Sequence, residues 1–195
     1  MVSYDNEVNI LIDFVKKLSP KKTLEVGCNF GRELGAIKDF TKTYGIDKNP
    51  ELVKGKKNLK CADGKEIPYN NNYFDLTYSD GCLSHNQEPE KILDEMIRVS
   101  KKYILLIEWI GAKTGTGYTN CKEGLSWIHD YEFLISGKEI KILFNRKIPC
   151  RADLFHVILL QKDKVKTKII ERVEIVKEEK KSRFSISLGK YKLEI

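Results

Sequence analysis

Hydrophobic and polar positions alternate along the first 161 residues in blocks that predict helices and strands in turn. Residues 5–18 carry apolar side chains at helical spacing, and Ser19-Pro20 ends this first helix. Short apolar segments predict strands at 23–26, 44–46, 58–61, 73–78, 103–107, 138–146 and 154–161. Further helices are predicted at 31–40, after Asn49-Pro50, from Glu88-Pro89 to Val99 and at 129–135. Strands that alternate with helices indicate an α/β fold, a doubly wound parallel sheet with helices on both faces.

The tail of the chain follows a different pattern. Residues 166–176 and 183–195 alternate polar and apolar side chains, and a charged run at 178–181 separates them. This pattern predicts a β-hairpin appended to the main domain, which gives a domain of residues 1–162 and a tail of residues 163–195. An isolated hairpin is only marginally stable in water. We therefore expect the tail to pack on its own domain or to form a homodimer.

Composition favours an ordinary soluble protein. The chain has 195 residues, of which 41% are hydrophobic and 32% charged, enough for one domain with a sizeable core. An apolar run near 18 residues and a basic leader are both absent from the sequence, so we expect no membrane span and no signal peptide. Five cysteines without a CxxC pair argue against a zinc site and favour the cytoplasm.

The positive charge is concentrated in the tail. Residues 162–195 hold 11 Lys or Arg against 6 Asp or Glu, which accounts for +5 of the formal net charge of +7. Such asymmetry can mark contact with a polyanion. A solvated, lysine-rich strand surface explains it equally simply, because lysines protect exposed strand edges from pairing. We favour the solvated surface over a nucleic-acid contact.

The first predicted strand runs into a glycine-containing loop, Glu25–Gly31. Ligands of doubly wound folds bind beyond the carboxyl ends of the strands. Glycine at 27 and 31 lets the backbone approach a ligand and turn into a helix. A dinucleotide fingerprint would require glycine at position 29 for contact with pyrophosphate, but the chain has Asn29. Because S-adenosylmethionine (SAM) lacks pyrophosphate, the loop favours SAM over NAD.

Two carboxylates follow the next two strands. Asp47 ends the second strand 20 residues after Gly27, where an acid accepts hydrogen bonds from ribose hydroxyls in both NAD and SAM sites. Asp63 follows the third strand, where a carboxylate can accept the adenine amino group. Three such features at successive strand ends indicate a nucleoside cofactor.

Four segments together resemble the motifs of class I SAM-dependent methyltransferases: Glu25–Gly31, Asp47, Asp63-Gly64 and Phe74–Asp80, within residues 20–161. The resemblance implies a mostly parallel, seven-stranded Rossmann-like sheet that ends in a C-terminal antiparallel strand pair. It also implies that the glycine loop holds methionine, Asp47 the ribose and Asp63 the adenine. The cofactor-binding residues expected from these motifs are Glu25, Gly27, Cys28, Asn29, Gly31, Asp47, Lys48, Asp63, Gly64 and Ser79.

A narrower resemblance involves the segments Gly81–Asn86 and Ser100–Trp109. They are similar to segments of the methylases associated with pseudaminic acid biosynthesis, although Asn86 replaces the usual isoleucine and the residues after Trp109 match poorly. This resemblance makes a sugar or a sugar nucleotide one candidate acceptor.

Methyl transfer from a sulfonium requires positioning, exclusion of water and, for a hydroxyl acceptor, a base. The candidate catalytic residues at the carboxyl edge of the predicted sheet are His85, Asp80 and Glu108, and His129 is a further candidate at the same edge. His85 has a suitable pKa class, but it can also cap the helix that follows. Glu108 ends a buried strand and either faces the site or pairs locally. The Gly- and Thr-rich stretch 111–124 predicts a loop near the acceptor.

The expected function is SAM-dependent transfer of a methyl group to an oxygen or nitrogen of a small molecule. One alternative is a methyltransferase that acts on RNA or protein through the basic tail. Another is a non-catalytic SAM-fold subunit whose hairpin docks a partner. Intact acids at 47 and 63 favour a working cofactor site. The scarcity of aromatics interleaved with arginine in residues 1–161 favours a small acceptor over RNA.

Overall fold

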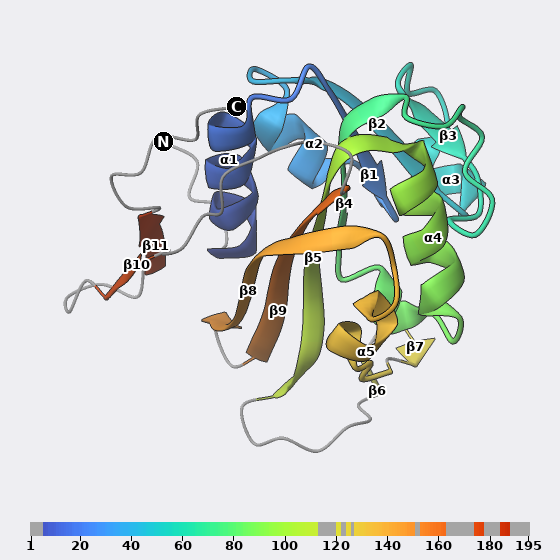
Figure 1. Cartoon of the computed structure of the whole chain (residues 1–195). Coiled ribbons are helices and arrows are strands. Elements are labelled where there is room, and N and C mark those ends of the chain that lie inside the picture. The colour runs from blue at the N-terminus through green and yellow to red at the C-terminus, as the bar shows by residue number, and fades with distance from the viewer. Residues whose placement is uncertain are drawn as a thin grey trace.

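The computed structural model describes residues 6–112, 120–121, 124–125, 127–150, 153–162, 174–177 and 184–187. A seven-stranded sheet with strand order β3-β2-β1-β4-β5-β9-β8 forms its centre (Figure 1). The five parallel strands are β1 (Lys22–Val26), β2 (Lys42–Asp47), β3 (Leu59–Cys61), β4 (Phe74–Asp80) and β5 (Ser100–Ala112). Two closing strands, β8 (Ile140–Cys150) and β9 (Asp153–Lys162), pair antiparallel, and β9 also runs antiparallel to β5. The predicted fold class is confirmed.

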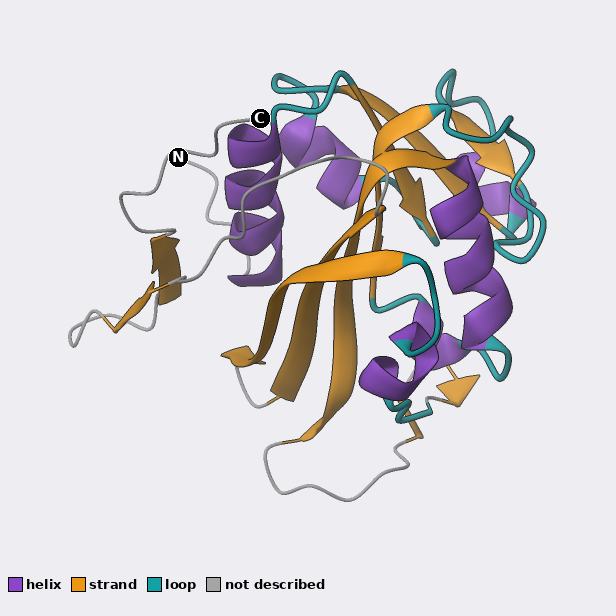
Figure 2. Ribbon diagram, viewed as in Figure 1, coloured by secondary structure: helices purple, strands orange, loops and turns teal. Residues whose placement is uncertain are grey.

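Helices cover both faces of the sheet (Figure 2). They are α1 (Asn6–Leu18), α2 (Arg32–Ile37), α3 (Pro50–Val53), α4 (Pro89–Val99) and α5 (Tyr131–Ile135), with a 3₁₀ turn, η1 (Leu83–His85). Side chains of α1 and α2 pack on one face and those of α4 and α5 on the other. The apolar run in β5 serves both cores, because Leu105 faces α1 while Ile104 and Leu106 face α4. None of the helices within the described ranges is long and apolar enough to cross a membrane.

Element boundaries differ most from the predictions at α2, at β5 and β8, and in the loop at 111–124. Helix α2 ends at Ile37 rather than at residue 40, and Gly31 precedes it as a left-handed N-cap with φ of 79°. Strands β5 and β8 extend beyond the predicted 103–107 and 138–146, because their ladders with β9 continue past the purely apolar stretches. The expected loop at 111–124 begins with the last two residues of β5 and contains two short paired strands, β6 (Asn120–Cys121) and β7 (Gly124–Leu125). Residues 113–119, 122 and 123 lie outside the described residues.

The tail contains the expected antiparallel pair. Strand β10 (Glu174–Lys177) pairs with β11 (Phe184–Ser187), and β11 lies near α1. The other apolar tail positions, such as Ile169 and Leu188, lie outside the described residues. The division of the chain at residues 162 and 163 stays a prediction.

Candidate functional site

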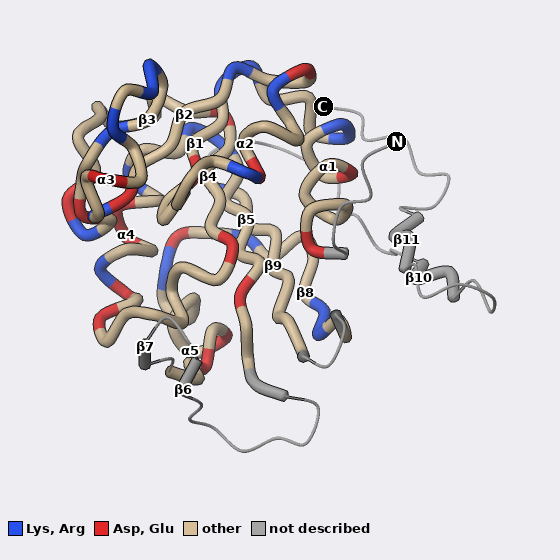
Figure 3. The backbone as a smooth tube through the Cα atoms, turned by 180° about the vertical axis from the view of Figure 1, so that it is seen from behind, with Lys and Arg blue, Asp and Glu red and all other residues tan. Residues whose placement is uncertain are grey.

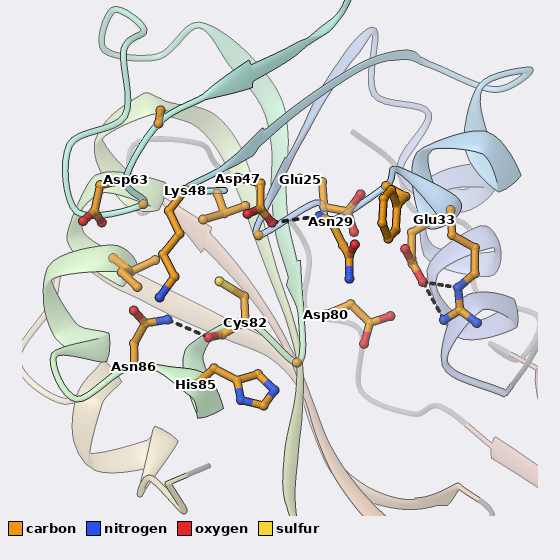
Figure 4. Close-up of a pocket in the computed structure, with 18 residues that line it drawn as sticks. Glu25, Asn29, Glu33, Asp47, Lys48, Asp63, Asp80, Cys82, His85 and Asn86 are labelled. Atoms are coloured by element: carbon orange, nitrogen blue, oxygen red, sulfur yellow. Dashed lines mark hydrogen bonds and ion pairs between the residues drawn. The ribbon is translucent and has the colours of Figure 1, made fainter. Parts of the chain in front are cut away.

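A cavity of about 460 Å³ lies at the carboxyl ends of β1, β2 and β4. The strand order reverses between β1 and β4, and doubly wound folds bind ligands at such a switch point. Its size is within the usual range for small-ligand sites. Nine of the predicted site residues line it: Glu25, Gly27, Asn29, Asp47, Lys48, Asp63, Gly64, Asp80 and His85 (Figure 4).

The glycine loop adopts a backbone that few residues accept. Gly27, Asn29 and Gly31 all have positive φ, of 77°, 47° and 79°. Asparagine tolerates this region better than most side chains, so Asn29 fits the left-handed turn without a glycine at this position. A Cβ atom at Gly27 would lie only 2.5 Å from the Sγ atom of Cys82. The loop therefore packs directly against the segment that follows β4.

Asp47 is held in place by the backbone on both sides. Its Oδ2 atom accepts a hydrogen bond from the Asn29 amide and its Oδ1 atom accepts one from the Asn49 amide, both at 2.9 Å. These contacts fix the carboxylate between the glycine loop and the start of α3. Each oxygen has lone pairs left for a ligand hydroxyl.

An apolar slot lies beside Asp63. A Cβ atom at Gly64 would be 3.0 Å from Cγ1 of Val26 and 3.3 Å from Cγ2 of Ile92, so only glycine leaves this space open. Asp63 is exposed, and its Oδ1 atom accepts the Lys65 amide at 2.9 Å. A narrow apolar slot with a carboxylate at its edge suits a flat heterocycle that bears an amino group.

Carboxylates gather on the α2 side of the cavity. Glu25 and Glu33 are buried, and Figure 4 shows Glu33 and Asp80 lying across the cavity from Asp63. Arg32 pairs with Glu33, with an Nη2–Oε1 distance of 2.6 Å. No described residue donates a hydrogen bond to Oε2 of Glu25 or to Oδ2 of Asp80.

These buried carboxyl groups are electrostatically perturbed. Burial raises the pKa of both Glu25 and Asp80 well above the usual range, and the Glu33 carboxylate raises both further. Such groups lower their energy by binding a cation. Perturbed carboxyls in a cavity are typical of functional sites.

Four predicted site residues lie outside the cavity lining. Cys28 is buried against Gly45, and burial raises the pKa of its thiol to about 12. Gly31 caps α2, and Ser79 is fully buried. Glu108 is also fully buried, and its carboxylate accepts the backbone amides of Leu83 and Ser84. Their contribution to the site is therefore indirect in this geometry.

The structure adds lining residues that the motif reasoning did not include: Val26, Phe30, Arg32, Glu33, Ala62, Gly81, Cys82, Asn86 and Ile92. Arg32 and Glu33 begin the helix that follows the glycine loop, so their position was available from the sequence. Cys82 and Asn86 are brought to the cavity by η1, an irregular turn that the hydrophobic pattern does not reveal.

Comparisons with known proteins agree with this geometry. A family model described as a methyltransferase domain matches residues 24–106. The chain is 35% identical over 98 residues to ajmaline N-methyltransferase of Rauvolfia serpentina, a match that covers 42% of this chain and 33% of that protein. The chain thus spans about a third of the length of this relative.

Two solved structures share the fold. A SAM-dependent methyltransferase from Aquifex aeolicus superposes with a TM-score of 0.60 at 22% identity, over 80% of this chain and 89% of that one. The 1,6-didemethyltoxoflavin-N1-methyltransferase of Burkholderia thailandensis, with bound S-adenosylhomocysteine (SAH), gives 0.63 at 15% identity, over 80% and 76%.

Proposed function

We propose that the chain is a class I SAM-dependent methyltransferase that uses SAM as its cofactor and methylates an amine nitrogen of a small molecule. The methyltransferase-domain model that matches residues 24–106 and the fold shared with SAM-dependent methyltransferases support this proposal. The observation that carries the choice of acceptor is the excess of carboxylates around the cavity. The partial match to a plant N-methyltransferase supports the same choice.

The residues present fit the cofactor. Asp47 would accept the ribose hydroxyls, and the slot between Val26, Gly64 and Ile92, with Asp63 at its edge, would take adenine. The glycine loop would then hold the methionine portion. When bound, SAM supplies an electrophilic methyl group on a sulfonium sulfur.

The charge of the cavity lining favours a cationic acceptor over an anionic one. In the described part of the chain, the lining contains five carboxylates, those of Glu25, Glu33, Asp47, Asp63 and Asp80, but only two basic side chains, Arg32 and Lys48. SAM carries an ammonium, a sulfonium and a carboxylate, and so a single net positive charge. Glu25 and Asp80, whose pKa is raised by burial, would ionise more readily when such a cation binds, which leaves an excess of negative charge in the cavity. The remaining field attracts a protonated amine and repels a sugar nucleotide, whose diphosphate is anionic.

Asp80 has the position and chemistry to handle the proton of such an acceptor. An amine that binds as an ammonium must lose a proton before its lone pair can attack a methyl carbon. The Oδ2 atom of Asp80, which accepts no hydrogen bond in the described structure, would first pair with the ammonium and then take its proton, which leaves the nitrogen lone pair available for attack on the methyl group. Its raised pKa brings proton transfer closer to neutral pH.

The test is a panel of primary and secondary amines, each paired with its isosteric alcohol, and a set of sugar nucleotides, with SAH formation measured by mass spectrometry. We expect the amines to react at least about tenfold faster than the matched alcohols. Asp80→Asn should slow the reaction about 100-fold, whereas Glu90→Gln, an exposed carboxylate on α4, should not. Preferential turnover of alcohols or sugar nucleotides contradicts the proposal.

A further inference from the structure

The segment Cys82–Asn86 forms one wall of the cavity. Cys82, His85 and Asn86 line it, and η1 lies within the segment. Inside the turn, the Asn86 side chain donates to the Cys82 carbonyl at 2.8 Å, and the Ser84 hydroxyl donates to the Gly81 carbonyl at 2.9 Å. These short-range bonds shape the turn but do not fix its place relative to the sheet. Its position therefore depends on contacts with other elements.

One of these contacts comes from the end of β5. The Oε2 atom of Glu108 accepts the amide of Leu83 at 3.1 Å and that of Ser84 at 3.3 Å. The side chain is fully buried and does not belong to the cavity lining. A charge-assisted hydrogen bond that a backbone amide donates to a buried carboxylate is among the stronger hydrogen bonds in proteins. Glu108 thus holds the Leu83 and Ser84 amides of the turn against the end of β5.

A second contact comes from the segment before α5. The Nε2 atom of His129 lies 3.1 Å from the Leu83 carbonyl and 2.8 Å from the Asn86 carbonyl. Carbonyls only accept, so Nε2 carries a hydrogen and donates it to both. The Trp127 amide adds a bond to the Ser84 carbonyl at 2.7 Å. The carbonyl groups of the turn are therefore held by the segment that precedes α5.

We propose that Glu108 and His129 are positioning residues that clamp the Cys82–Asn86 turn and so fix the wall that faces the methyl acceptor. Glu108 acts through backbone amides rather than as a base on the substrate. The kinetic part of this inference rests on the proposed function, since it needs an acceptor. The structural part does not, because the contacts of the clamp are present in the protein without an acceptor.

Four variants separate this role from the alternatives. Glu108→Ala removes both acceptor bonds, whereas Glu108→Gln keeps a carbonyl oxygen that can accept both amides but cannot act as a base. His129→Phe keeps a ring without a donor. Asp75→Ala is the matched control, because Asp75 Oδ2 also accepts two consecutive amides, those of Lys21 and Lys22, at the opposite end of the sheet.

Amide exchange measured by NMR on the SAH-saturated protein gives the first readout. Glu108→Ala should speed exchange at Leu83 and Ser84 at least about tenfold, and Glu108→Gln should keep it within about threefold of the parent. Asp75→Ala should affect Lys21 and Lys22 instead. His129→Phe, which loses the bonds to the turn carbonyls, should also speed exchange within the turn, so the test survives if Glu108→Ala does not fold.

Steady-state kinetics with the fastest amine of the panel gives the second readout. Glu108→Ala and His129→Phe should raise the acceptor KM or lower kcat about tenfold while the KM for SAM changes less than about threefold. Glu108→Gln should recover most of the loss. The proposal is overturned if Glu108→Gln abolishes turnover while exchange at Leu83 and Ser84 stays normal, the signature of a base. It is equally overturned if Glu108→Ala and His129→Phe both fold and leave exchange unchanged. Inactivity towards every amine would count against the proposed function alone.

Discussion

Replacing Gly27 with alanine tests the closest packing contact of the site. Gly27 has φ of 77°, and the added Cβ would lie 2.5 Å from Sγ and 2.7 Å from Cβ of Cys82. The loop has little freedom to move away, because the amides of Gly27 and Cys28 both donate to the Ile46 carbonyl of β2 at 2.9 Å. The substitution therefore combines a strained backbone with a steric clash.

Backbone strain and the steric clash each contribute to the expected loss of folding free energy. A left-handed backbone costs an alanine about 1–2 kcal/mol. Overpacking against a rigid neighbour costs about 1–3 kcal/mol more. We expect Gly27→Ala to lower the free energy of unfolding by about 2–5 kcal/mol, measured by urea titration. Since the loop lines the cavity, SAM affinity measured by calorimetry should fall at least about tenfold.

Gly81 provides the matched control. It also has positive φ, 67°, but a Cβ atom there would meet nothing within 4 Å in the described structure, so Gly81→Ala should show the backbone cost alone. Combining Gly27→Ala with Cys82→Gly removes the clash and should restore about 1–3 kcal/mol as a coupling free energy. Equal destabilisation by Gly27→Ala and Gly81→Ala, with no coupling to Cys82→Gly, would refute the packing argument.

Other predictions test the remaining parts of the molecule. Asp47→Ala should weaken SAM binding by about 1.5–3 kcal/mol in calorimetry, because hydrogen bonds to a charged group are lost. Gly35→Ala, in α2 with open space around its Cβ position, should raise the free energy of unfolding by up to about 1 kcal/mol in urea titrations. Burial raises the pKa of Glu108 from 4.5 to about 7, so the folded state binds this proton more tightly than the unfolded state. Stability should therefore fall as pH rises through this window, by up to about 3 kcal/mol relative to Glu108→Gln, in urea titrations at pH 5 and 8. Deleting the residues after Asp163 should leave SAM affinity within about tenfold and change the mass measured by light scattering if the hairpin mediates a dimer.

The sequence predicts the architecture well because buried positions recur at the spacing of the helix or strand to which they belong. Apolar side chains in β5 that alternate between two cores produce the continuous run Tyr103–Ile107, and the amphipathic pattern of α4 marks its buried face. Strand ends also predict the positions of Asp47 and Asp63, because the carboxyl ends of parallel strands meet at one edge. Irregular segments such as η1 carry no periodic signal, so Cys82 and Asn86 were not among the predicted site residues, and His85 was predicted from its imidazole chemistry.

The alternation of side chains along strands explains which predicted residues reach the cavity's acidic wall. Neighbouring residues of a strand point to opposite faces. In β4, Asp80 shares its face with Tyr78, which packs in the core of α1 and α2, so Ser79 points to the other face. In β5, Glu108 shares its face with Leu106, in the core of α4 and α5.

Ser79 and Glu108 therefore lie on the face of the sheet that packs against α4 and α5, and Asp80 lies on the face that packs against α1 and α2. All three residues nevertheless lie at or near the carboxyl end of a strand. Glu25 alternates with Leu24 and Val26 of the α4 core, which places it on the same side as Asp80. Alternation alone separates these two groups from the sequence. It does not say which group faces a ligand, because that depends on the turn after β4, whose backbone amides bind Glu108 from 24 and 25 residues away. The carboxylate that the motif reasoning assigned to chemistry is instead used by the fold to hold the turn.

The distribution of charge along the chain also bears on the choice between a small acceptor and RNA. Lys and Arg positions (blue) and Asp and Glu positions (red) are interspersed along the described backbone in the view of Figure 3. Residues 1–161 hold 24 Lys or Arg against 22 Asp or Glu, whereas the cavity lining holds five carboxyl groups against Arg32 and Lys48. A field confined in this way acts on a ligand that enters the cavity rather than on a macromolecule that docks outside it. This favours a small cationic acceptor over RNA for the described domain.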